Sequence, residues 1–380
     1  METVPAGLLQ YLQQVPDSRG RKGRRHPFTA MLAVMVSAML CKFEGYDAVA
    51  EWIRTLPIEV WHAFGGTRKP PCANAYGKLM NQVCPRELER ALNNWITEGL
   101  GLNLEQEAAA IIIDGKVLRG TRSEHSRTMQ VLAALDQYTG CVLSETKVDA
   151  KTNEAKTALT FLQDLVLKGK TLVGDAAFCQ RDIYEQVIAA EADYLILVKD
   201  NQPTLHKEAI QAFVIPEGFP PFAKRKAREA RRTATMTDKS RGRIERRTLI
   251  TTTVGTDTSD WPGVQQFLKL ERETTVKGET RRTVSYAVTT HSPSTASADR
   301  LLRLWRDRWA IENRAFWVKD VTFREDHCRA RTGNGPYCLS VLRNATMNYI
   351  RASGNSSIVS ILRTNALKLK HTLAKLGILI

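Results

Sequence analysis

Residues 109–115 read Ala-Ala-Ile-Ile-Ile-Asp-Gly, an apolar run that ends in an acid and a glycine. A run this rich in β-branched side chains predicts a buried strand with Asp114 at its end. Two more short strands are predicted over 131–135 and 141–146, and the Gln-Tyr-Thr-Gly of 137–140 is typical of the turn between them. The chain therefore begins a sheet here.

The pattern downstream alternates between helix and strand. Helical spacing is expected over 154–167 and 181–190, and short apolar strands over 171–174 and 194–198, with Asp175 directly after the first of these strands. Three strands followed by helix, strand, helix and strand are typical of an α/β (α+β) layer with a mixed sheet.

The hydrophobic and charge patterns along the chain predict four segments. They are an N-terminal helical domain with a basic rim (1–105), the first part of the α/β core (106–200), a β-rich insertion with a basic stretch (201–292), and C-terminal helices that include a long one over 298–318 (293–380). Within the insertion, alternating apolar positions predict strands over 246–254, 267–275 and 283–289.

The charge balance indicates a polyanionic partner. Lys and Arg number 55 against 40 Asp and Glu, which leaves a net charge of +15. Nucleic acid is the commonest partner of so basic a protein, and a charge that serves only solubility is the alternative. We therefore expect the basic-rimmed segment 1–105 to be a DNA-binding domain. Residues 224–247, which include Arg243, hold eleven Lys and Arg against three acids. They are a candidate phosphate-binding surface, or else a mobile solvated loop.

Other site classes find little support. The seven cysteines form no C-x-x-C pair, so a zinc or thioredoxin-like site is not indicated, and free thiols in a reducing cytoplasm are expected. Met1–Pro5 has no signal-peptide pattern, and the apolar stretch 28–40 is too short to span a bilayer. We therefore expect a cytoplasmic, nucleoid-associated protein without a membrane partner.

Three acids stand out as a candidate catalytic set. Asp114 and Asp175 follow apolar strands, and a rigid sheet would fix their oxygen atoms for metal binding. Glu312 lies in the predicted helix 298–318, beside apolar positions such as Trp309, so we expect it near the buried edge of that helix. Three carboxylates can hold two Mg²⁺ ions.

Each acid also has an ordinary structural interpretation. Asp114-Gly115 could be a hairpin turn. Asp175 could cap the next helix, and Glu312 could pair with Arg308 one helical turn before it. Taken singly, each of these interpretations is at least as good as the functional one, and it is the joint placement of the three acids that favours a site.

Three segments resemble the catalytic motifs of IS4-type DDE transposases. They are Ile113-Asp114-Gly115-Lys116, Gly174-Asp175-Ala176, and Arg308-x3-Glu312-x6-Lys319, which matches the Y-x2-R-x3-E-x6-K signature with Trp305 in place of the tyrosine. The ISAs1 group, which includes the H-repeat-associated proteins, is similar over longer runs. These runs are 309–313, 317–326, Val15-Pro16-Asp17-x-Arg19 and Gly23-x-Arg25-His26, and the resemblance covers residues 6–350.

The resemblance implies an RNase H-like catalytic core with a β-rich insertion before the last catalytic helix. It implies a transposase that hydrolyses and transfers DNA strands at insertion-element ends, using Mg²⁺, for which Mn²⁺ can substitute. The catalytic, metal-binding acids would be Asp114, Asp175 and Glu312. The DNA contacts would come from Arg308, Lys319, Lys116 and Arg243. The expected partners are double-stranded DNA, as terminal repeats and target, and further copies of the chain on that DNA.

Two other functions stay open. One is a DNA-binding protein derived from a transposase and no longer mobile, and the other is a nuclease of the same fold. The intact set of acids favours catalysis over binding alone. Trp309 and Trp317 are expected in the core, while Glu325 and Asp326 could support the site or be surface charges.

Overall fold

The computed structural model describes residues 7–21, 24–107, 109–122, 128–149, 154–215, 218, 220–240, 242–355 and 357–380. Gly23 of the N-terminal motif and Arg241 of the basic stretch lie outside these ranges. The chain folds into two compact units. Unit 1 comprises Met1–Gln106, Gly115–Ala150 and Ile311–Ile380, and unit 2 comprises Glu107–Asp114 and Lys151–Ala310. The units cut across the four predicted segments, so that division stays a prediction.

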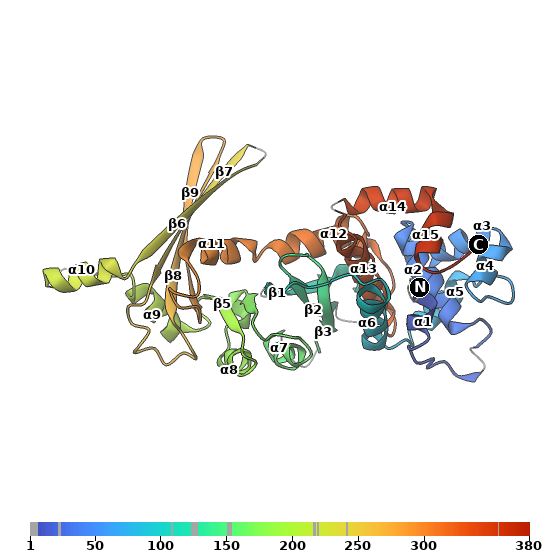
Figure 1. The fold of residues 1–380 in the computed structure, drawn as a ribbon, viewed down its shortest axis with the longest axis horizontal. Coiled ribbons are helices and arrows are strands. Elements are labelled where there is room, and N and C mark those ends of the chain that lie inside the picture. The colour runs from blue at the N-terminus through green and yellow to red at the C-terminus, as the bar shows by residue number, and fades with distance from the viewer. Residues whose placement is uncertain are drawn as a thin grey trace, which may run out of the picture. The chain divides into compact units, whose positions relative to one another are not determined.

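Unit 1 contains most of the helices (Figure 1). They are α1 (Leu8–Leu12), α2 (Phe28–Leu40), α3 (Gly45–Thr55), α4 (Ile58–Ala63), α5 (Ala73–Met80), α6 (Pro85–Asn94), η2 (Trp95–Gly99), η3 (Arg119–Thr121), η5 (Ile311–Phe316), α12 (Trp317–Val321), η6 (Glu325–His327), α13 (Gly335–Ala352), α14 (Ile358–Leu367) and α15 (Leu369–Lys375). The 18-residue helix α13 is buried along most of its length and packs against α2 and α6. It therefore forms the centre of the unit.

The chain leaves unit 1 after Gln106 and returns to it within strand β1 (Ala110–Leu118), whose residues fall in both units. In unit 1 it continues into the order β3-β2-β1, where β2 (Met129–Asp136) and β3 (Val142–Lys147) form the predicted antiparallel hairpin. Asp114-Gly115 lies inside β1, which runs on to Leu118. The hairpin-turn interpretation of that dipeptide is therefore wrong.

Unit 2 continues the sheet in the order β1-β4-β5-β9-β8-β7-β6. Strands β4 (Thr171–Gly174) and β5 (Asp193–Val198) run parallel, and they alternate along the chain with helices α7 (Glu154–Gln163) and α8 (Arg181–Ala189). A short 3₁₀ turn, η4 (Ala176–Phe178), follows β4. The predicted order of elements and the mixed α/β class are both confirmed.

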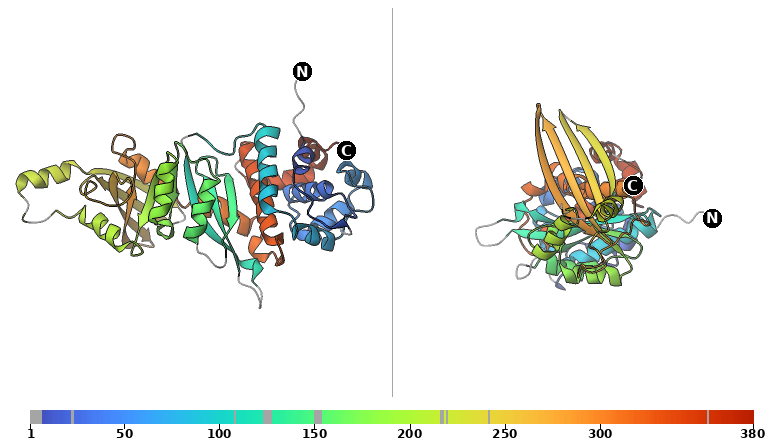
Figure 2. Two further views of the ribbon diagram at one scale, coloured as in Figure 1. Left: turned by 90° about the horizontal axis from the view of Figure 1, so that it is seen from below. Right: turned by 90° about the vertical axis from the view of Figure 1, so that its left-hand side faces the viewer.

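The insertion is a four-stranded antiparallel extension of this sheet, and Figure 2 shows its strands side by side. The strands are β6 (Arg232–Ser240), β7 (Arg243–Thr252), β8 (Gln266–Val276) and β9 (Glu279–Thr289). Helices α9 (Pro203–Gln211) and α10 (Pro221–Glu229) precede them. The described part of the basic stretch 224–247 thus lies on α10, β6 and β7, so the interpretation of this stretch as a loop is wrong. Most side chains along β6 are polar, so the hydrophobic pattern of the sequence does not predict this strand.

The long helix predicted over 298–318 is interrupted. Helix α11 (Ala298–Asp307) ends in unit 2, and η5, a π-helix, and then α12 follow in unit 1. A π-helix bonds each N–H to the fifth carbonyl before it, so the 3.6-residue spacing of an α-helix does not apply across η5. Side chains predicted to share one face of a continuous helix can therefore point in different directions.

Among the described residues, no single helix is long and apolar enough to cross a membrane. The pair α2 and α3 passes the same test of length and composition only when taken together, across a bend of 97°.

Candidate active site

Asp114, on strand β1, and Asp175, directly after strand β4, lie at the same level of two neighbouring parallel strands. In the β1–β4 pairing, Ile112 stands opposite Val173, so two residues further along each strand Asp114 comes level with Asp175. Both acids lie where the parallel pairing ends on its carboxyl side, the edge at which α/β sheets commonly bind ligands. The strands therefore bring together two acids that the sequence separates by 61 positions.

Asp175 has acceptor capacity that the described residues around it do not fill. Its Oδ1 accepts a hydrogen bond of 2.7 Å from the backbone N–H of Ala176, so the predicted capping role is present. Two cations approach it, with Lys199 Nζ at 3.6 Å from Oδ1 and Arg308 Nη1 at 3.9 Å from Oδ2. Both distances are longer than a hydrogen bond. The half-buried carboxylate thus lies in a positive environment, but neither cation is close enough to form a hydrogen bond with it.

Arg308 is held by an aromatic ring. Its guanidinium carbon lies 5.0 Å from the centroid of Trp309, and Arg247 and Arg272 lie at 5.8 Å and 5.3 Å from the same ring. Cations over an indole face gain from its quadrupole, most strongly where water is excluded. Arg308 keeps only 11% of its side chain exposed. Trp309 itself is half-buried, so it lies at the margin of the core and not inside it.

Arg243 lies at the start of β7, with 46% of its side chain exposed. Its guanidinium pairs at 3.1 Å with Glu245, which also pairs at 2.8 Å with Arg247. Arg243 therefore presents its charge at the surface of the insertion while one of its edges is fixed by a carboxylate.

Glu312 is exposed, so the prediction that it lies near a buried edge is wrong. It is the second residue of η5, in which Ile311, Ala315 and Phe316 are the buried positions. The wider turn of a π-helix shifts which residues share a face, and it leaves Glu312 facing solvent. Single-turn π-helices are frequent at functional sites.

Lys319 is fully buried in unit 1, in contrast to Glu312. Its ammonium lies 2.8 Å from Glu145 and 3.6 Å from Glu325, and it donates a hydrogen bond to the Ser340 hydroxyl. Burial alone would lower the pKa of Lys319, but the two carboxylates raise it above its usual value. The DNA contact of Lys319 stays a prediction, and in this structure its charge is directed at the interior of the protein.

Lys116 has a similar environment, with 6% of its side chain exposed. Its ammonium lies 2.6 Å from Asp320 and 3.8 Å from Glu325. Glu325 is itself 3% exposed and pairs with Arg343 at 3.1 Å, so the interpretation of Glu325 as a surface charge is wrong. A DNA contact from Lys116 also stays a prediction.

Asp114, Asp175 and Glu312 are the candidate ligands of a metal ion. Within either unit, the described residues contain no group of three His, Cys, Asp or Glu side chains that could hold one. Unit 2 supplies the pair Asp114 and Asp175, and the third predicted ligand, Glu312, belongs to unit 1. All three donors are carboxylate oxygens, the ligands that Mg²⁺ prefers. The donor chemistry therefore fits the metal that the resemblance implies.

The structure matches the expected class of catalytic domain in three features. It has an α/β core with parallel strands, two acids at the same level of its edge, and a β-rich insertion before the last helix. A family model described as "Transposase DDE domain" matches residues 105–349, and one described as "DDE_Tnp_1-associated" matches residues 9–96. The chain belongs to the family of DDE transposases, whose catalytic domain has an RNase H-like core.

Relatives in Escherichia coli are similar along most of the chain. The putative protein YbfL of strain K12 is 26% identical over 354 residues, which cover 90% of both chains. The H repeat-associated putative transposase YhhI of the same strain is 25% identical with the same coverage. The putative transposase YncI of strain O157:H7 is 25% identical over 90% of this chain and 87% of its own length. The resemblance to the ISAs1-type, H-repeat-associated group is thereby confirmed.

Proposed function

We propose that the chain hydrolyses DNA phosphodiester bonds and transfers DNA strands at the ends of an insertion element, with Asp114, Asp175 and Glu312 as its metal-binding acids. The observation that carries the proposal is the level placement of Asp114 on β1 and of Asp175 directly after the adjacent parallel strand β4. Rigid strands fix the separation of two carboxylates better than loops do.

The acidic and the basic residues would have separate roles in this reaction. Asp114, Asp175 and Glu312 would bind divalent ions through their carboxylate oxygens. When bound, two such ions activate the attacking oxygen and stabilise the leaving oxygen. Arg308 would orient the scissile phosphate from its place beside Asp175, because its guanidinium is positioned by Trp309 and offers planar donor pairs to phosphate. Arg243 would contact the DNA backbone from the insertion.

Metal-dependent cleavage tests the acids directly. The full chain is incubated with DNA that carries the terminal repeats of its element, with Mg²⁺ or Mn²⁺ and with EDTA. We expect cutting only with metal, and each of Asp114→Asn, Asp175→Asn and Glu312→Gln should reduce it by more than about 100-fold, since they remove direct ligands. DNA binding in EDTA should persist in all three.

Two exposed acids outside the site serve as matched controls. Asp260→Asn and Glu191→Gln remove carboxylates that are 93% and 69% exposed, and both should cut like the wild type. Full activity in any of the three site variants would overturn the assignment of that acid. Cutting without joining to a target would identify a nuclease, and binding without cutting would identify a DNA-binding descendant of a transposase.

A further inference from the structure

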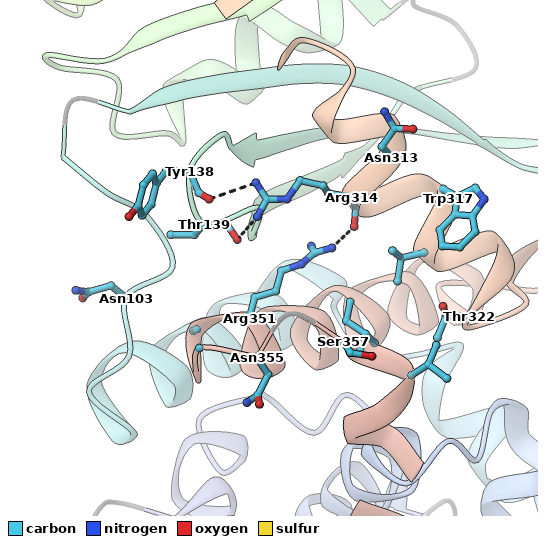
Figure 3. A pocket seen from close by; sticks show the side chains of 15 residues that line it. Asn103, Tyr138, Thr139, Asn313, Arg314, Trp317, Thr322, Arg351, Asn355 and Ser357 are labelled. Atoms are coloured by element: carbon cyan, nitrogen blue, oxygen red, sulfur yellow. Dashed lines mark hydrogen bonds between the residues drawn. The ribbon is translucent and has the colours of Figure 1, made fainter. Parts of the chain in front are cut away.

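Unit 1 contains a cavity of about 730 Å³ that the catalytic proposal does not use (Figure 3). Its walls come from the turn between β2 and β3, from η5 and α12, and from the C-terminal end of α13. Asn313, the residue after Glu312, is part of the lining. The size lies in the range of small-molecule sites, which run from about 300 to 1,000 Å³.

The charge of the cavity is positive. Of the fifteen described lining residues, two are arginines and none is acidic. Arg314 donates to the carbonyl oxygens of Tyr138 at 3.2 Å and Thr139 at 2.7 Å, and Arg351 donates to that of Arg314 (Figure 3). Arg314 also donates to the carbonyl oxygen of Gln137 at 2.7 Å, and Arg351 to that of Gly140. These acceptors are neutral, so they position the guanidinium groups without cancelling their charge.

The two arginines also act on one another. Burial, together with the nearby charge of Arg314, lowers the pKa of Arg351 to about 10, which leaves it charged at neutral pH. Two like charges at one cavity wall repel, and an anion bound there would relieve that repulsion. The lining therefore favours an anionic ligand over a cationic one.

Two aromatic side chains flank the same space. Trp317 is 58% exposed and Tyr138 is 71% exposed, although the sequence predicts Trp317 in the core. An aromatic ring beside a positively charged wall suits a ligand that has both a π-face and a phosphate, because bases stack on aromatic side chains. Side-chain amides of Asn103, Asn313 and Asn355 add donors and acceptors to the lining.

We propose that this cavity binds an unpaired nucleotide of a DNA strand, with the base against Trp317 and Tyr138 and the phosphate toward Arg314 and Arg351. The choice of DNA over other phosphate polymers rests on the proposed function. The remainder of the inference rests on the cavity itself. The site would hold a strand that has left the duplex, which is a task separate from the acids.

Binding of single-stranded DNA tests the inference without cleavage. The affinity of the full chain for a labelled single-stranded oligodeoxynucleotide is measured in EDTA. Trp317→Ala should weaken it about tenfold, and Tyr138→Ala should act in the same direction, because stacking on an aromatic ring contributes substantially to the binding of each base. Trp317→Phe should restore most of the affinity. Binding of blunt duplex should not change, nor should the melting temperature.

The matched control lies one turn further along the same helix. Val321→Ala removes another exposed apolar side chain (55% exposed) that does not line the cavity, and it should bind like the wild type. Equal affinity of Trp317→Ala and wild type for the single strand would overturn the proposal.

An abasic oligonucleotide separates base recognition from phosphate binding alone. It carries the same phosphates, so wild type and Trp317→Ala should bind it equally, and a tenfold difference there would contradict stacking. Competition by inorganic phosphate at low millimolar concentration, with no effect of Trp317→Ala, would reduce the cavity to a phosphate site. Tighter binding of an RNA strand would reassign the polymer. If cleavage fails while these results hold, only the catalytic proposal falls.

Discussion

Lys319 belongs to a buried group of charges in unit 1. Glu145 and Glu325 supply two negative charges, and Lys319 and Arg343 supply two positive ones. All four side chains are at most 3% exposed. Buried ions are tolerated only when they are paired, because each has lost its hydration. The ammonium of Lys319 is therefore the cation that pairs with the Glu145 carboxylate inside the protein.

This arrangement predicts a loss of stability when the cation is removed. Lys319→Met keeps the length of the side chain but leaves Glu145 without its buried cation, and breaking such a pair costs about 3–5 kcal/mol. The midpoint of urea unfolding should fall accordingly. Lys370→Met, which removes an exposed lysine, should leave the midpoint unchanged. An unchanged midpoint in Lys319→Met together with weaker DNA binding would instead favour the DNA contact that the family motif implies.

Residue types at strand ends could be predicted from the sequence, but exposure could not. Asp114 and Asp175 can be identified because each follows an apolar run, and parallel pairing of β1 with β4 then makes them neighbours. Glu312 and Trp317 were misplaced because their predicted orientation assumed a continuous α-helix. Nothing in the local pattern of residues 311–316 marks a π-helix. Arg351 could not be connected with Arg314 either, since tertiary packing alone brings them together.

The turn between β2 and β3 shows how an element is positioned by side chains distant in sequence. Arg314 and Arg351 bond to four consecutive residues of this turn, from Gln137 to Gly140. Gly140 adopts a φ of +72°, and a Cβ on it would lie 2.3 Å from the guanidinium carbon of Arg314. Both the backbone angle and the close approach of Arg314 require glycine.

Gly140→Ala should therefore destabilise unit 1 by about 1–3 kcal/mol from backbone strain, with a further cost from displacing Arg314. Gly169 offers a matched control, because it has the same φ of +72° and nothing within 4 Å of an added Cβ. Thermal or urea unfolding should show a larger loss for Gly140→Ala than for Gly169→Ala. Equal losses would mean that the contact with Arg314 contributes nothing.

Elements of the core were easier to predict than those of the insertion. Strands β4 and β5 are short, buried apolar runs, and these runs identify them almost to the residue. Strand β6 has threonine at every second position from Thr233 to Thr237 and charged side chains at both ends, so its local apolar signal is weak and its pairing with β7 stabilises it. Its stability comes from neighbours that the local sequence does not contain.

At the scale of the molecule, the net charge of +15 is unevenly distributed. Helix α10 has four basic residues among its nine, and none of its described residues is buried. A helix this short is marginal without packing. Phosphate contacts would supply a reason for it to form. The C-terminal helices α14 and α15 and the residue between them also expose four basic side chains, Arg363, Lys368, Lys370 and Lys375.

The basic residues of α10 and those of the C-terminal helices allow the effect of charge location on DNA binding to be separated from the effect of total charge. One variant of the full chain carries Lys224→Gln, Arg225→Gln, Lys226→Gln and Arg228→Gln, and the other carries Arg363→Gln, Lys368→Gln, Lys370→Gln and Lys375→Gln. Duplex binding is measured against salt in EDTA. Each lost phosphate contact lowers the log–log slope by about 0.9, so the α10 variant should lose about 2 to 4. The C-terminal variant should lose less than about 1. An equal loss in both would show that net charge, and not α10, governs the binding of duplex DNA.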